Sequence, residues 1–577
     1  MKRLHLPNVI KNLKNHFLQL LSMVAALCPF ASLSPDAPSP EQRKTQLLST
    51  LKRNWYIPFS ALAFFCLNAT TTPGYFAGVL IAFIASVVIA LQIPAQYTAM
   101  GQARRWMQVV AILTALGICW NIKDALSLQL LAAPLPVLPQ RPRVVLALDV
   151  LSFPFVYFCV LLFWRKMAKV FSEIKVLDGI TKAEWVVYGI LLAASLTFMG
   201  MTFVQTEAFR GRDCSYDLIY TSDSPLEWGN SFLVLTHAEN DIRQPLFAVF
   251  AAPFVGIPYL LGKLLGGSMT VQAISINIVQ VIMLFFANFM VAKMIRLNAG
   301  KRICFLILTS CTYTYLLFIL MMDQYIVAYF WLILCIYWIS QNQQPDRIAM
   351  WGAGGTLLTS MILLPFMSAQ NPVRNFKVWF ADMVKYGLEF VGVMLVFCRF
   401  DVIYNALSQL SKLHQYNGNI LTFTDKLYQY TAFLSGCFAA PDAGERMNVD
   451  NLISWQLRPV TGIHFLGIGI LLLAVVSVIV NRKKRSSLVA AGWVVFSAVI
   501  LLGMGWGTAE NGLILYALYF GWALLVLLFQ LVEKIADKLN VQFLVPVFSI
   551  GCAAALAVIN IPAIMELVNF AITNYPT

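Results

Sequence analysis

The sequence predicts an all-α polytopic membrane protein, and three observations support this. The 577 residues are 59% hydrophobic and only 12% charged, with a mean hydropathy of +0.73. Soluble proteins carry roughly 25% charged residues, so a mainly soluble chain is excluded. Apolar runs long enough to cross a bilayer recur along the chain. Short clusters of Lys and Arg separate these runs, as expected for cytoplasmic loops.

The net charge of +14 does not indicate a nucleic-acid partner. The basic clusters lie between apolar runs, where anionic membrane lipid attracts them. Most of the 11 cysteines fall inside apolar runs and are interpreted as small core residues. The sequence shows neither metal-ligand spacing nor a C-x-x-C motif. Cys214 and Cys437 fall in predicted external loops, so a disulfide between them is left open.

Residues 1–54 are predicted to be a basic cytoplasmic segment. Its apolar core, Phe17–Cys28, follows several lysines and resembles a signal peptide. An interfacial helix is preferred, because cleavage would leave four basic residues outside, against the positive-inside rule. Residues 55–183 are predicted to add four transmembrane helices. These are Ile57–Asn68, Tyr75–Ile93, Trp106–Trp120 and Val144–Phe163.

Trp185–Val204 then crosses outward to an external loop, residues 205–267. The positions of the basic residues decide whether the next two apolar runs, 245–265 and 271–292, can both cross the membrane. If both crossed, four basic residues would lie outside: Lys293, Arg296, Lys301 and Arg302. The run 245–265 contains three prolines, so we expect it to lie along the outer surface as an interfacial helix or to dip into it. Val271–Val291 then crosses inward.

The rest of the chain adds further spans, for a total of about 13 crossings with a cytoplasmic N-terminus. A broken or re-entrant pair bent near Pro365 is expected within 352–370. The other spans are Ile303–Met321 and Tyr325–Ser340 around Asp323, Leu388–Phe400, His464–Val480, Leu488–Gly505, Leu513–Val532 and Phe543–Ile561. Residues 401–460 form a second external loop, and residues 461–577 hold the C-terminal transmembrane helices.

The external loop 205–267 concentrates acidic residues in a chain with only 27 Asp and Glu. They are Glu207, Asp213, Asp217, Asp223, Glu227, Glu239 and Asp241. Ser224 to Glu227 reads as a capping box with Pro at the first helical position, which explains Glu227 structurally. Asp241 to Gln244 is a second candidate capping box, so Asp241 stays open between a cap and a site. Asp223 has no structural role in this interpretation.

Asp223 and Arg243 suit transfer of a sugar from a polyprenyl phosphate at the outer membrane surface. Asp223 would be the general base for an acceptor hydroxyl, or a metal ligand. Arg243 is expected in the first turn of a helix, where a cation opposes the macrodipole, so a nearby anion is expected: Glu239 or a ligand phosphate. The sequence contains no nucleotide-binding motif, and an external site has no access to nucleotide sugars.

Over about residues 185–370 this pattern resembles the GT-C class of integral membrane glycosyltransferases, which includes protein O-mannosyltransferases and lipid A aminoarabinose transferases. The matching elements are Thr221-Ser222-Asp223, Arg243-Gln244-Pro245-Leu246, Gly266-Gly267, Lys293 and Arg296. The resemblance implies a catalytic module at 184–400 that uses inverting direct displacement. It implies a polyprenyl-phosphate-sugar donor, a glycan, lipid or protein acceptor, and a periplasmic site on the bacterial inner membrane, within the cell envelope.

The sequence departs from the class in two ways. Asp223 is followed by Ser224 instead of a second acid, so the use of a divalent metal, Mg²⁺ or Mn²⁺, is left open. Four spans precede the usual first span, which makes residues 1–183 an addition. The candidate catalytic residues are Asp223, Glu239 and Asp241. The candidate substrate-binding residues are Arg243, Gln244, Asp217, Glu510 in the turn Gly505–Gly512, and Arg458 and His464 in or beside the second external loop.

Two alternatives to a monosaccharide transferase remain. A transporter or flippase of a lipid-linked glycan would place charges near the midplane of its spans. Asp149 and Glu389 are instead expected near span ends, which favours the enzyme. A glycan polymerase or ligase would use the same donor class and is poorly separated from a transferase by sequence.

Overall fold

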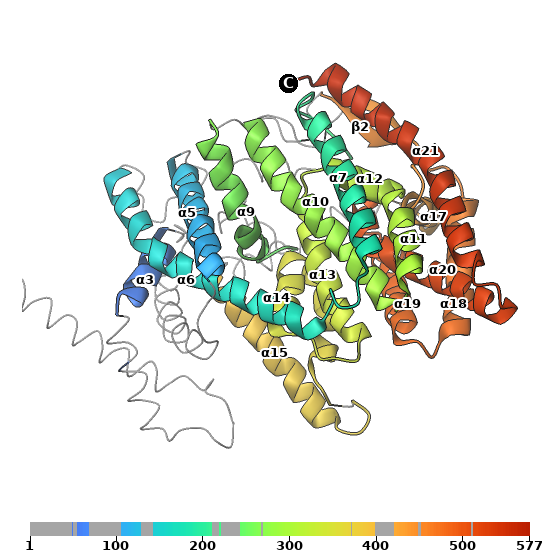
Figure 1. Ribbon diagram of the computed structural model, residues 1–577, viewed down its shortest axis with the longest axis horizontal. Helices are drawn as coiled ribbons and strands as arrows, with labels where there is room; N and C mark the ends of the chain where they lie inside the picture. Colours follow the sequence, from blue (N-terminus) through green and yellow to red (C-terminus); the bar gives the residue numbers. More distant parts are fainter. Residues whose placement is uncertain are drawn as a thin grey trace, which may run out of the picture.

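The structure is a computed structural model, and it is α-helical apart from one two-stranded sheet in the part that it describes. This part comprises residues 49, 55–67, 105–127, 142–209, 218–220, 243–266, 269–370, 372–397, 421–447, 452–508 and 512–577. Figure 1 shows the helices side by side in one bundle, with α3 (Tyr56–Leu67) near one end and α21 (Leu544–Asn574) at the other. The all-α prediction is confirmed for these residues.

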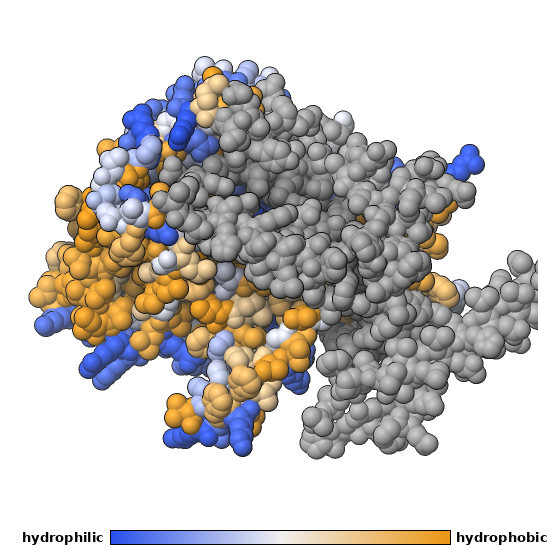
Figure 2. Space-filling model, turned by 180° about the vertical axis from the view of Figure 1, so that it is seen from behind, coloured by the Kyte–Doolittle hydropathy of each residue, from blue (hydrophilic) through white to orange (hydrophobic). Residues whose placement is uncertain are grey.

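The described residues hold eight helical stretches that are long and apolar enough to cross a membrane, or nine with one bent pair. Figure 2 shows an apolar belt between hydrophilic rims on one face, so the chain fits an integral membrane protein; about 13 crossings remains a prediction. The eight stretches are carried by α5 (Arg105–Ser127), α6 (Pro142–Ile174), α7 (Lys182–Phe203), α9 (Phe247–Leu264), α10 (Met269–Met294), α19 (Arg485–Ser497) with η4 (Ala498–Gly503), η5 (Gly512–Tyr516) with α20 (Ala517–Leu539), and α21.

The two ends of the bundle differ in chemistry. At one end, which we call the loop face, α7 finishes beside the C-terminus: the Glu207 amide donates to the Tyr575 carbonyl at 2.9 Å. At the opposite end, the basic face, Lys293 Nζ donates to the Asp178 carbonyl at 2.5 Å. Lys301 and Lys484 there both pair with Glu533, at 3.2 and 3.4 Å. Basic residues of the α10–α11 and α18–α19 turns therefore share one end of the bundle with the α6–α7 turn, as the sequence predicts.

The segment 245–265 does not lie flat on the surface, so that expectation is wrong. Its helix α9 is mostly buried, and Figure 1 shows it beside α10. The chain is deep in the bundle just before α9, where the Leu246 amide donates to the Gly355 carbonyl at 2.8 Å. After α9 the chain turns near Gly266, with φ at +104°, and α10 runs back to the basic face. The alternative reading, a segment that dips into the membrane, agrees with this path.

The predicted span Ile303–Met321 is two helices, α11 (Ala299–Ser310) and α12 (Tyr313–Leu320), bent by 66°. Asn560 of α21 supports this break, because its amide donates to the carbonyls of Cys311 and Phe438 at 2.8 and 2.7 Å. A second break separates α12 from α13 (Gln324–Ser340). Here Asn277 and Gln280 of α10 donate to Ile319 and Asp323 carbonyls. Side-chain amides thus satisfy backbone groups that a broken helix leaves unpaired.

The predicted break within 352–370 is present, but it falls at a different residue. Helix α14 (Arg347–Thr356) ends at Leu357, whose backbone is extended, and the 3₁₀ helix η2 (Leu358–Met367) follows. The break is therefore at Leu357 and not near Pro365, which lies inside η2. Helix α15 (Phe376–Phe397) comes next.

The second external loop contains a β-hairpin, which the sequence analysis did not predict. Helix α17 (Phe423–Gly436) leads to β1 (Ala443–Met447) and β2 (Ile453–Leu457), and α18 (Phe465–Asn481) follows. Trp455 of β2 donates its amide to the Leu218 carbonyl at 2.8 Å and accepts the Tyr220 amide at 2.9 Å. Backbone pairing therefore joins the two predicted external loops. Cys437 is a buried free thiol, and Cys214 lies outside the described residues.

The N-terminal helices pack tightly on the rest of the bundle through glycines. A Cβ on Gly117 of α5 would stand 1.9 Å from the carbonyl oxygen of Gly256 of α9, and one on Gly256 would stand 2.6 Å from that of Thr114. Small residues let two membrane helices approach backbone to backbone. Helices of the added region 55–183 are therefore part of the same packed body as α9.

Replacing Gly117 with Leu should force α5 and α9 apart, because the obstructing atom belongs to rigid backbone. We expect a destabilisation of about 1–3 kcal/mol or more, the usual cost of overpacking. The melting temperature of the purified protein in detergent measures this. Gly189→Leu is the matched control, since a Cβ on Gly189 of α7 meets nothing within 4 Å. Equal melting temperatures for the two variants would contradict the tight helix crossing.

Candidate functional site

The predicted site residues divide between the described and the undescribed parts of the chain. Asp217, Asp223, Glu239, Asp241 and Glu510 lie outside the described residues. The structure places the other four, which are Arg243, Gln244, Arg458 and His464.

Arg243 and Gln244 lie inside the bundle, ahead of α9. The Arg243 carbonyl accepts the Leu358 amide at 2.8 Å, so the break between α14 and η2 holds this segment. Gln244 is buried, and its Oε1 has no hydrogen-bond partner. Helix α9 begins only at Phe247, and its N-cap, Leu246, makes no side-chain cap bond. The expectation of a helical first turn at Arg243 is therefore wrong, whereas Asp241 lies outside the described residues.

Asp323 is a buried acid that the sequence analysis treated only as a hairpin turn. It is 0% exposed and caps α13, where its Oδ1 accepts the Tyr325 amide at 3.0 Å. The Gln280 side-chain amide donates to the backbone carbonyl of Asp323 at 2.6 Å. A carboxyl group is costly to bury in a membrane bundle, so such residues are usually functional. The sequence signal was available, because Asp323 is the only charged residue between two long apolar runs.

Tyr325 lies next to Asp323 and within electrostatic range of Arg243. Its amide donates to Asp323 Oδ1, and the Arg243 charge is near enough to influence its hydroxyl. The Tyr325 ring packs against the rings of Tyr516 and Tyr519, with centroids 5.9 and 5.2 Å away. We call these five residues the interior site. It joins three distant segments: the chain before α9, the start of α13, and the η5–α20 junction. Arg243, Tyr325 and Tyr516 are partly exposed, whereas Asp323 and Tyr519 are buried.

The predicted turn Gly505–Gly512 lies next to the interior site. Trp506 Nε1 donates to the Tyr516 hydroxyl at 2.9 Å. Gly505 has a φ of +70°, and a Cβ there would stand 2.8 Å from Lys426 Nζ of α17. The described start of this turn therefore contacts Lys426 at Gly505 and the interior site at Tyr516, whereas Glu510 lies outside the described residues.

Arg458 and His464 lie elsewhere. Arg458 pairs with Asp442 at 3.4 Å beside the hairpin, and both side chains are largely exposed. His464 is exposed, and its amide donates to Thr431 Oγ1 at 3.1 Å. The contacts of neither residue bring it to Arg243. Arg458 is therefore a surface ion-pair residue in this structure.

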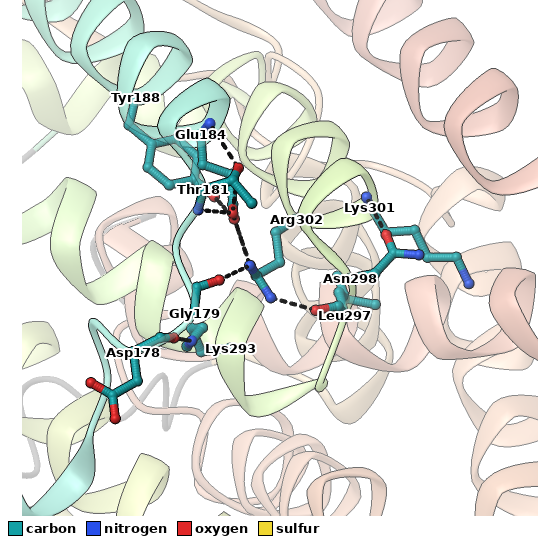
Figure 3. Close-up of polar contacts among 10 residues, drawn as sticks. All are labelled: Asp178, Gly179, Thr181, Glu184, Tyr188, Lys293, Leu297, Asn298, Lys301 and Arg302. Carbon is teal, nitrogen blue, oxygen red and sulfur yellow. Dashed lines mark hydrogen bonds and ion pairs between the residues drawn. The ribbon is translucent and has the colours of Figure 1, made fainter.

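Figure 3 shows a second polar cluster, at the basic face, built around Glu184 and Arg302. The guanidinium donates to both carboxylate oxygens, at 2.7 and 2.9 Å. Tyr188 and the Thr181 amide also donate to Glu184, each at 2.8 Å. Arg302 also donates to the carbonyls of Leu297 and Gly179, at 2.6 and 3.1 Å. Because each group is paired within the protein, this cluster fixes the α6–α7 and α10–α11 turns together.

No three His, Cys, Asp or Glu side chains form a metal-ligand group within the described ranges. The predicted acids of the loop 205–267 mostly lie outside those ranges, so a divalent metal stays an open prediction. Comparisons with protein-family models, with curated proteins and with solved structures find no match to this chain. The proposed function therefore depends on the residues and contacts above.

Proposed function

We propose that this protein is a membrane glycosyltransferase that transfers a sugar from a polyprenyl-phosphate-linked donor to a glycan, lipid or protein acceptor. The observation that supports this most is the interior site, where a fully buried Asp323 caps α13 at Tyr325 and Arg243 lies within electrostatic range of the same tyrosine. A guanidinium suits a phosphate because its fork of N–H groups matches the phosphate oxygens. Asp323 is a positioning residue for Arg243 and Tyr325, and Gln244 Oε1 is a hydrogen-bond acceptor for a sugar hydroxyl.

The proposed reaction is a single inverting displacement. Asp223 removes the proton from the acceptor hydroxyl, and the acceptor oxygen bonds to the anomeric carbon. The bond from that carbon to the phosphate oxygen breaks, and polyprenyl phosphate leaves. Arg243 stabilises the charge that grows on the leaving phosphate. Glu239 and Asp241 are further candidates for the base, and Glu510 for contacts with the acceptor.

The proposed location is a bacterial inner membrane with the N-terminus in the cytoplasm. The clustering of Lys and Arg at the basic face supports a cytoplasmic position for that end of the bundle. The loop face would then lie in the periplasm, and the interior site would receive its donor from the outer leaflet.

A transporter or flippase of a lipid-linked glycan is the second candidate, because the structure shows features typical of carriers. Asp323 is buried at a helix break, and the α11–α12 pair is bent by 66°. Sugar transfer by the detergent-solubilised protein would support the enzyme. Movement of the lipid-linked glycan across the membrane of sealed vesicles, without sugar transfer, would support the carrier.

The test of the proposed enzyme is the Asp223→Asn variant, assayed with a labelled polyprenyl-phosphate sugar and isolated membranes. Transfer should be lost because the amide is not a base, while protein level and membrane insertion stay normal. Asp213→Asn, in the same loop, is the control and should keep activity. Full transfer by Asp223→Asn would remove Asp223 from the mechanism. Cysteine labelling that places position 223 in the cytoplasm would overturn the topology.

A further inference from the structure

An open polar cleft of about 640 Å³ lies on the basic face, at the opposite end of α13 from the interior site. It is bounded by α6, by the turn from α13 to α14 and by α15. Lys166, Asp346, Arg347 and Tyr386 are among its lining residues. Trp338 lies in its wall, and the neighbouring Tyr337 is within range of the charges of Arg296 and Asp178, which places the cleft at the basic end.

Two cations in this cleft keep N–H groups that their protein contacts do not use. Lys166 Nζ meets Asp346 Oδ2 at 2.6 Å, and its side chain is 30% exposed. Arg347 Nε lies 3.3 Å from Glu389 Oε2, and its side chain is 49% exposed. The guanidinium also lies over the Tyr386 ring, 5.2 Å from the centroid. An ammonium has three donors and a guanidinium five, so both retain donors for an anion.

Helix α15, which carries Tyr386 and Glu389 at the cleft, also carries exposed apolar side chains on its other sides. Figure 1 shows α15 extending away from the main bundle beneath α14. Its Phe376, Phe380 and Leu388 are 60%, 47% and 66% exposed, although Lys377 and Lys385 are on the same helix. Exposed aromatic and aliphatic side chains together with lysines are typical of helices that lie at the membrane–water interface. A lipid bound at the cleft would therefore have an apolar helix, α15, along which its acyl chains can lie.

We propose that this cleft binds the headgroup of an anionic phospholipid that carries free hydroxyl groups, such as phosphatidylglycerol. Its phosphate lies against Lys166 and Arg347, as in other basic pockets at the cytoplasmic ends of membrane helices. Glu173 and Asp346, in the same cleft, accept hydrogen bonds from the headgroup hydroxyls. The acyl chains lie along the exposed apolar side chains of α15. This site is independent of the proposed sugar transfer.

The experiment is native mass spectrometry of the purified full-length protein in detergent, with dioleoyl phosphatidylglycerol or dioleoyl phosphatidylcholine added. We expect phosphatidylglycerol to remain bound at least about tenfold more than phosphatidylcholine. The variant Lys166→Gln/Arg347→Gln should lose that preference, since both phosphate ligands are gone. Arg458→Gln is the control, because it removes an exposed cation at the hairpin and should keep the preference.

Three results would overturn the proposal. The first is equal retention of the two lipids by the wild type. The second is an unchanged preference in Lys166→Gln/Arg347→Gln; if that variant unfolds, Arg347→Gln alone is tested, since it leaves the Lys166–Asp346 pair intact. The third is a rise in melting temperature with glycerol 3-phosphate alone that equals the rise with phosphatidylglycerol. That result would assign the cleft to a soluble phosphate compound.

Discussion

Replacing Glu184 with Gln is expected to destabilise the protein by about 3–5 kcal/mol, the typical cost of breaking a buried ion pair. Glu184 is fully buried, and the amide would leave the Arg302 charge without its partner. The amide would also turn an NH₂ group toward donors from Thr181 or Tyr188. Since this cluster holds two turns of the basic face together, α7 should lose its fixed position relative to α10 and α11. Unfolding of the purified protein in detergent, followed by circular dichroism, measures the change.

Two controls separate this buried pair from ordinary surface charge. Arg458→Gln breaks an exposed pair with Asp442, and such pairs contribute about 0–1 kcal/mol. Replacing both Glu184 and Arg302 with Met should restore part of the lost stability, because no unpaired charge stays buried. If Glu184→Gln were as stable as the wild type, the cluster would not hold the turns together.

Replacing Asp323 with Asn is expected to reduce sugar transfer at least about tenfold, or about 1.4 kcal/mol of transition-state stabilisation, with little change in melting temperature. Asn caps a helix as well as Asp does, so the bond to the Tyr325 amide is kept. Only the negative charge beside Arg243 and Tyr325 is removed. Initial rates at several donor concentrations, with melting temperature measured on the same samples, test both parts of the prediction.

Asp346→Asn is the matched control for this charge removal. Asp346 also caps a helix, with its Oδ1 accepting the Ile348 amide at 3.0 Å, but it lies at the basic face. It should keep normal transfer. Asp323→Ala should lose both stability and transfer, because the cap bond disappears. Wild-type transfer by Asp323→Asn would show that Asp323 is only a helix cap.

The sequence was informative wherever one local property decides structure. Its apolar runs identified the membrane class, because transfer of apolar side chains into lipid depends on composition. The positions of Lys and Arg grouped the turns after α6, α10 and α18 at one end of the bundle. Charge parity predicted that the segment before α10 does not simply cross, and this stays a prediction, since α9 is long and apolar enough to span a membrane. The same parity argument predicted a break within 352–370. The structure has this break, at Leu357 and not near Pro365.

Only the tertiary structure decided which distant residues meet. Arg243, Asp323 and Tyr516 are separated by long stretches of chain, and no periodicity relates them. The pairing of Leu218 and Tyr220 with Trp455 likewise depends on backbone hydrogen bonds between loops that the sequence showed only as polar. The composition and charge of a segment determine whether that segment lies in water or in lipid, independently of the other segments. Contacts such as those of Asn560 and Gln280 stabilise broken helices only after the helices have packed, so a single sequence does not reveal them.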